Sequence, residues 1–182
     1  MRTAAVMAAT APQSISGFDS TGADLLILTI DGASTAVHTA TVTDSMSNTG
    51  VKLTNQGNNS NQEHSSWYCC SPATSASHSF TQTGGPFSTF RVSAYAGYDT
   101  FDKEVGRGLT TNVSPGPVTP SVDNSLILCL GCSRSPGTYT IDSGFTIDAQ
   151  NPFVGSVNCG SAHASLQQTT AAAVTPSWSN AM

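Results

Sequence analysis

The 182-residue sequence predicts an all-β protein: an antiparallel, jelly-roll-like β-sandwich of eight to ten short strands with no substantial helix. Three observations predict this fold class. Short apolar or alternating segments recur at nearly regular spacing, turn residues bound each of them, and no run of ten residues carries apolar side chains at helical spacing. Parallel α/β folds need crossover helices, so these strands are expected to pair antiparallel in a sandwich.

Two aliphatic segments, 25–30 and 125–132, predict buried strands at the centres of the sandwich. In both, a turn with an acidic residue leads into a four-residue run that contains Leu-Ile-Leu, so we interpret them as equivalent entry strands. The other expected strands alternate or are shorter, with apolar side chains on one face. They are residues 35–43, 65–70, 78–83, 89–96, a hairpin of 139–141 with 145–149, 162–167 and 171–175.

The domain organisation expected is one β-sandwich over residues 21–182, preceded by an N-terminal arm or edge strand over residues 1–20. The N-terminal stretch is rich in alanine but lacks the leucine and phenylalanine of a signal-peptide core, which disfavours a secretory leader. Two long connections, 44–65 and 98–125, interrupt the strands. Loops of this length in a compact domain are frequent sites of partner contact.

The composition is low in charge and rich in hydroxyl groups. Charged residues make up 9% of the chain, the formal net charge is −5, and there are 26 serines and 24 threonines. We expect these hydroxyls largely on outward strand faces and in turns. Six basic residues cannot form a phosphate-binding stripe, so no nucleic-acid partner is expected. No apolar run approaches the roughly 20 residues that cross a bilayer, so no membrane partner is expected either.

Catalytic signatures are missing from the sequence, so we expect no enzyme, no cofactor and no metal. The four histidines are spread over different segments: His38, His64, His78 and His163. There is no Gly-x-Ser-x-Gly nucleophile motif and no marked carboxylate pair of the kind that glycosidases use. Asp99, Asp102 and Glu104 cluster in one loop but lack the glycine and carbonyl spacing of a calcium loop.

Five cysteines are present: Cys69, Cys70, Cys129, Cys132 and Cys159. Cys129 and Cys132 have the spacing of half a zinc knuckle, but side chains three apart on a strand face opposite ways and no second pair accompanies them. We expect core cysteines that pack as small hydrophobic residues. The alternative is a disulfide of Cys159 with Cys70 or Cys132 in an oxidising compartment.

Aromatic residues gather between positions 87 and 101. Phe90 and Trp67 fit the core of the sandwich. Tyr95, Tyr98 and Phe101 lie at a strand end and in a loop, where we expect rings that contact a ligand or a neighbouring subunit.

The order of the strand motifs carries a family resemblance. The motifs lie at residues 22–28, 42–45, 66–69, 92–97, 123–128 and 174–178. Their order resembles the jelly-roll-type β-sandwich domains encoded in bacteriophage and related bacterial genomes, several of which are virion surface proteins. Such domains continue after the Thr-Pro-x-Trp element into a final apolar strand. In this sequence only residues 179–182 follow that element, which departs from the pattern. We therefore expect either that residues 4–9 close the sheet or that an edge stays open for a neighbour to cover.

The resemblance and the low charge together lead us to expect a non-enzymatic virion structural protein. The leading hypothesis is a capsid decoration (cement) protein that binds at capsomer junctions and stabilises the shell. Its partners would be the major capsid protein or other virion proteins, and further copies of itself, because capsid sites are symmetric. The alternatives are a tail or fibre receptor-binding domain and a carbohydrate-binding module, with a secreted location in place of the capsid surface.

Overall fold

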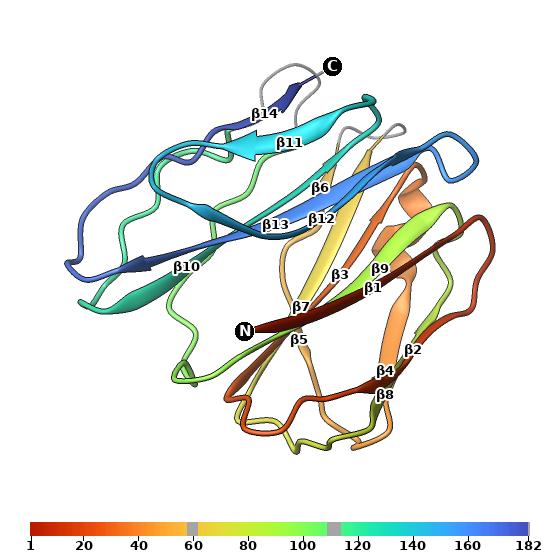
Figure 1. Cartoon of the computed structure of the whole chain (residues 1–182), viewed down its shortest axis with the longest axis horizontal. Helices are drawn as coiled ribbons and strands as arrows, with labels where there is room; N and C mark the ends of the chain where they lie inside the picture. Colours follow the sequence, from red (N-terminus) through yellow and green to blue (C-terminus); the bar gives the residue numbers. More distant parts are fainter. Residues whose placement is uncertain (58–61, 109–113, 182) are drawn as a thin grey trace.

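The computed structural model describes residues 1–57, 62–108 and 114–181, which form four layers of antiparallel strands (Figure 1). The layers make two stacked β-sandwiches. In the first sandwich, a six-stranded sheet of order β1-β9-β3-β7-β5, with β6 also on β7, faces a sheet of order β2-β8-β4. Its strands are β1 (Arg2–Ala8), β2 (Gln13–Phe18), β3 (Leu25–Gly32), β4 (Thr41–Asp44), β5 (Val51–Lys52), β6 (Gln56–Gly57), β7 (Glu63–Cys70), β8 (His78–Thr83) and β9 (Ser88–Tyr95).

The second sandwich is smaller. A three-stranded sheet of order β10-β13-β12 faces the pair β11-β14. Its strands are β10 (Ser125–Ser133), β11 (Thr138–Ile141), β12 (Thr146–Val154), β13 (Cys159–Gln168) and β14 (Trp178–Ala181). The all-β, antiparallel prediction is confirmed. The jelly-roll arrangement stays a prediction.

Each sandwich has its own hydrophobic core. In the first, every second residue of β3 and β9 points inward, and Leu26, Ile30, Phe90 and Val92 are each 0% exposed. Removing these side chains from water is the main favourable term that holds the two sheets together. In the second, Ile127 of β10 belongs to a core built round two alanines of β13 and an edge-to-face pair of Tyr139 and Trp178.

A polar layer separates the two cores. On the face of β3 and β9 opposite the first core, Thr29, Arg91 and Ser93 are each no more than 2% exposed. They meet the face of β13 that carries Ser161 and His163. The expectation that hydroxyl residues lie largely outward is therefore wrong for this face, because a second sheet covers it instead of water.

Several strand predictions agree closely with the structure, and others are wrong. β8 has the predicted bounds, and β3, β7, β9 and β13 differ from the predicted segments by a few residues at their ends. Residues 35–43 do not form one strand, because Ser34 caps a 3-10 turn (η1, Thr35–Thr39) and β4 begins only at Thr41. The hairpin of 139–141 with 145–149 is also wrong, since β11 pairs with β14 and β12 with β13.

Two further differences concern the edges of the sheets. The segment 171–175 forms no strand, only a bridge between Val174 and Val118. β10 is not the central strand that was expected, because β13 covers one edge and no described strand covers the other. In total, fourteen strands occur in the described part of the chain, more than expected, because several are very short or lie in the N-terminal segment.

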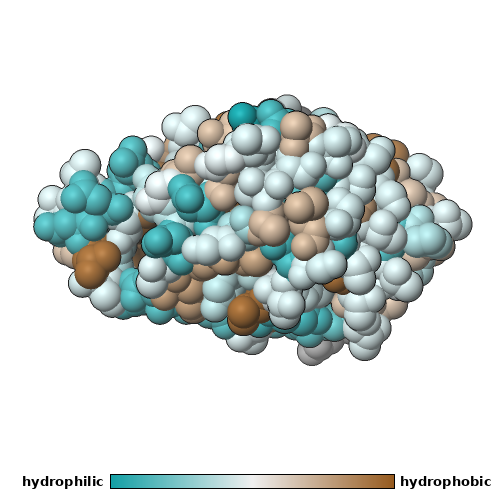
Figure 2. Space-filling view, turned by 90° about the horizontal axis from the view of Figure 1, so that it is seen from below, coloured by the Kyte–Doolittle hydropathy of each residue, from teal (hydrophilic) through white to brown (hydrophobic). Residues whose placement is uncertain are grey.

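The first twenty residues contribute strands to both sheets of the first sandwich. β1 pairs with β9 along seven residues, and β2 pairs with β8. Ile15 and Phe18 of β2 belong to the first core. Figure 2 shows the underside of the molecule, where most of the surface has intermediate hydropathy and hydrophobic residues are scattered. This agrees with the low charge of the sequence.

Candidate binding cleft

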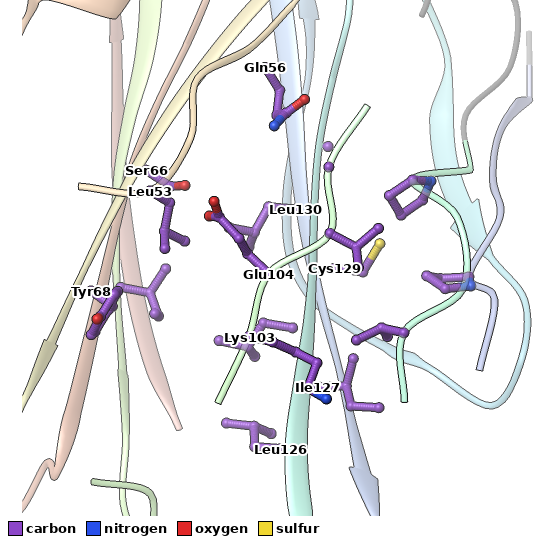
Figure 3. Close-up of a pocket in the computed structure, with 18 of the residues that line it drawn as sticks. Leu53, Gln56, Ser66, Tyr68, Lys103, Glu104, Leu126, Ile127, Cys129 and Leu130 are labelled. Carbon is purple, nitrogen blue, oxygen red and sulfur yellow. The ribbon is translucent and has the colours of Figure 1, made fainter. Parts of the chain in front are cut away.

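A cleft with a volume of about 730 Å3 runs between the two sandwiches along β10. One wall of the cleft is the face of β3 and β7 that carries Ile27, Ser66 and Tyr68. The neighbouring Leu53 belongs to the same wall. On the other side lies β10, and the loop 97–108 passes between them (Figure 3). This volume is in the range of about 300–1,000 Å3 that is usual for ligand sites.

The cleft follows the edge of β10 and not one of its faces. Every residue from Ser125 to Ser133 lines it. Successive side chains of a strand point to opposite faces, so only a cleft at the edge meets all of them. Figure 3 shows Leu126 and Leu130 on the side of β7, and Ile127 and Cys129 on the opposite side. The backbone N–H and C=O groups along this edge have no strand partner in the described part of the chain.

Two of the three aromatic residues singled out from the sequence lie at the cleft. Phe101 is 39% exposed and stacks on Tyr68, with ring centroids 4.5 Å apart and an interplanar angle of 11°. Tyr98 is half-buried and lines the cleft beside them. Tyr95 does not take part: it is 5% exposed, and its hydroxyl donates a hydrogen bond of 2.9 Å to Asp148. Burial, with the nearby Asp148 carboxylate, raises the pKa of Tyr95 above its ordinary value.

A histidine–aspartate pair, missed at the level of sequence, also lies at the cleft. His64 Nδ1 is 2.5 Å from Asp31 Oδ1, and Asp31 is fully buried. The pair forms because Asp31 and His64 are directly opposite each other in the β3–β7 register. In serine hydrolases a carboxylate on Nδ1 likewise orients the imidazole ring, and Nε2 is the nitrogen that takes up the proton.

A serine lies close to this pair along β7. Ser66 is the next residue on the same face of β7, and both Ser66 and His64 line the cleft. Within the described residues, however, no hydrogen bond joins Ser66 to His64, and acyl transfer needs a nucleophile in contact with its base. The pair therefore provides a fixed polar group on a mainly apolar wall.

The acidic loop is held by hydrogen bonds from its neighbours. Asp102 accepts a bond of 2.8 Å from the backbone N–H of Ser121. Glu104 accepts bonds from the backbone N–H and the hydroxyl of Thr54. Both carboxylates thus fasten the loop 97–108 to other residues that line the cleft. In the described residues no group of three or more His, Cys, Asp and Glu side chains is arranged to hold a metal ion.

The five cysteines are all free thiols in the structure. Cys129 points into the second core, whereas Cys132 lies on the other face of β10, where its Sγ is 3.8 Å from the Glu63 carbonyl oxygen. The two sulfurs thus diverge. Cys159 is buried, and its Sγ donates to the Asp31 carbonyl oxygen at 3.1 Å. Burial raises the pKa of Cys129 to about 12, which keeps its thiol protonated.

The other three histidines lie in separate places. His163 lies in the polar layer, while His78 and His38 lie in the first sandwich. His78 Nε2 is 3.0 Å from Asp44 Oδ2, and His38 Nε2 is 2.9 Å from Glu63 Oε2. Only His64 lines the cleft along β10. The sequence has no signal for these pairs, because each depends on strand register or on how the sheets stack.

Comparison with known proteins gave no match: the chain matches no protein-family model, no curated protein and no solved structure. In the described part of the chain, no helix is long and apolar enough to span a bilayer.

Proposed function

We propose that the protein is a non-enzymatic structural protein of a bacteriophage virion, where it decorates the capsid at capsomer junctions. The observation that carries this proposal is the cleft along β10: a nine-residue strand edge with four aliphatic side chains that no described strand covers. Exposed strand edges pair with other chains unless they are protected, so this edge is suited to hold a neighbouring protein.

The composition supports the same role. The cores of protein interfaces are depleted in charged residues, and only 9% of this chain is charged. The sequence resemblance to virion surface domains supports a location on the particle. The major capsid protein is the proposed partner, and a symmetric oligomer is proposed because the lattice sites are symmetric.

Two measurements test this role. Mass spectrometry of purified virions should detect the chain in stoichiometric amount with the capsid proteins, and its absence would reject the proposal. Capsids that lack the protein should melt at a lower temperature and recover on its addition. A matched pair of variants then tests the cleft. Leu128→Arg in its wall should abolish capsid binding, whereas Val154→Arg, on an exposed residue of β12 outside the cleft, should not.

The stacked pair of Tyr68 and Phe101 favours a second candidate, a carbohydrate-binding module. Exposed aromatic rings beside hydroxyl groups are suited to stack on sugar rings. A glycan array would show saturable binding that Tyr98→Ala and Phe101→Ala remove. Phe87→Ala is the control, because Phe87 is 46% exposed and lies outside the cleft. If no glycan is bound, this candidate is rejected.

A further inference from the structure

We propose that the cleft along β10 is an acceptor site for an added β-strand, donated in extended form by another protein and aligned antiparallel to β10. The proposal rests on the binding role above and names how the partner is held.

The two sandwiches repeat the same strand order. In the first, β3 pairs with β7, β4 with β8 and β5 with β7. In the second, β10 pairs with β13, β11 with β14 and β12 with β13, all antiparallel. Strand for strand along the chain, β3 therefore corresponds to β10, β7 to β13 and β8 to β14.

The repeat shows what is expected at the free edge. β3 is covered on its second edge by β9, which follows β8 in the chain and pairs antiparallel over eight residues, from Leu25↔Tyr95 to Gly32↔Ser88. In the described part of the second sandwich, no strand takes the place that β9 has in the first. The cleft lies at that place. An antiparallel strand is therefore the occupant that the fold of this chain itself uses at the equivalent position.

The β10 strand is regular along its whole length. Its pairing with β13 runs from Ser125↔Gln168 to Ser133↔Gly160 without a register shift. Two other edge strands are interrupted: β2 has an irregularity between Ile15 and Phe18, and β12 has two shifts, whereas β1 and β4 pair without a shift. Bulges of this kind protect edges from further pairing. β10 lacks them, and no described strand covers the second edge of residues 125–132, so the N–H and C=O groups there form a regular template.

The shape of the cleft favours a single added strand over a second copy of the chain. The face of β7 and the loop 97–108 stand opposite β10. A second copy pairing through its own β10 would bring its β13 and this loop with it. A single extended segment brings only its own side chains. Leu126 and Leu130 lie on one side of β10, and Ile127 and Cys129 lie on the other. Leu128 is on the side of Leu126 by the alternation of the strand, so both sides select small or aliphatic donor residues.

The test uses the full-length protein and a fluorescein-labelled peptide with the β9 sequence, residues 88–95, carrying Arg91→Val so that no charge is placed beside the aliphatic side chains of β10. Fluorescence anisotropy should show saturable binding, and a scrambled peptide should not bind. Two further peptides carry N-methyl groups on alternate backbone amides. One peptide is methylated at the amides that face one edge of the strand, and the other at the amides that face the opposite edge. Only one set of amides faces β10, so one methylated peptide should bind about tenfold or more weakly and the other should bind like the parent.

Three results would overturn the proposal: no binding of the parent peptide, equal effects of the two methylated sets, or a dimer of the protein that excludes the peptide. The last would mean that a second copy covers the edge. Leu128→Arg should weaken binding, while Val154→Arg should not, and circular dichroism checks that both variants fold. Because no capsid is present, failure here is separate from failure of the virion role, which mass spectrometry of the particle decides.

Discussion

His163 on β13 joins the two sandwiches through Thr29 on β3. Its Nε2 lies 2.9 Å from the Thr29 hydroxyl, and its Nδ1 lies 3.3 Å from the hydroxyl of Ser93 on β9. All three residues are 0% exposed. A neutral imidazole has one donor and one acceptor nitrogen, and hydroxyl groups can serve both. The polar layer between the two cores is therefore satisfied at this point without any charge.

This arrangement predicts a dependence of stability on pH. Burial, with Arg91 and His64 nearby, lowers the pKa of His163 well below 6.5. Above pH 6.5 the ring is neutral in both the folded and the unfolded state. Below it, only the unfolded state takes up the proton, so the free energy of unfolding falls as pH falls, by at most about 1.4 kcal/mol per pH unit.

Urea unfolding at pH 8, 7, 6 and 5 measures this dependence. His163→Gln should lower the free energy of unfolding at every pH and also flatten its decline below pH 6.5. If the variant and the wild type decline in parallel, another group causes the acid sensitivity and the assignment to His163 is wrong.

A second prediction concerns close packing in the second sandwich. A methyl group added at Gly160 would lie 2.7 Å from Tyr139 Oη and 2.8 Å from the backbone nitrogen of Phe153. Gly160→Ala should therefore lower the free energy of unfolding by about 1–3 kcal/mol, the usual range for overpacking. Gly155→Ala is the matched control, because its nearest contact would be at 4.0 Å. Equal effects of the two variants in thermal unfolding would show that the packing round Gly160 is looser than described.

A third prediction concerns the thiols. The thiolate is the reactive form of cysteine, and burial raises the pKa of Cys129 and Cys159. Iodoacetamide at pH 8 should therefore modify the half-buried Cys70 first and leave Cys129 and Cys159 unmodified in the native protein. After unfolding without reductant, mass spectrometry should find all five cysteines labelled. Fewer than five labels would reveal a disulfide that the structure lacks.

Most of the strands could be predicted from the sequence, because a period of two marks them wherever one face is apolar. Residues 78–83 and 89–96 are examples, with Phe80 and Phe90 inward. The layer count could not be predicted. The pattern of β9 separates the face of Phe90 from the face of Arg91, but it does not tell whether the second face meets water or another sheet.

The candidate site could be predicted only in part. Tyr98 and Phe101 could be predicted as contact residues because aromatic residues gather between positions 87 and 101, and both line the cleft. The pair of Asp31 and His64 depends on the β3–β7 register, which is set by tertiary packing. The edge of β10 that no described strand covers could not be predicted either, since residues 126–128 have the same Leu-Ile-Leu run as residues 26–28 of the central strand β3.

Both edges of β3 are covered by strands, whereas no described strand covers the second edge of β10, and amide hydrogen exchange measured residue by residue with NMR tests this difference most directly. Amides of residues 125–132 that face β13 are hydrogen-bonded, and those that face the cleft have no backbone partner among the described strands. The structure therefore predicts alternating slow and fast exchange along residues 125–133, against uniformly slow exchange along residues 25–32. Uniformly slow exchange along β10 would contradict the claim, because it would mean that its second edge is already paired.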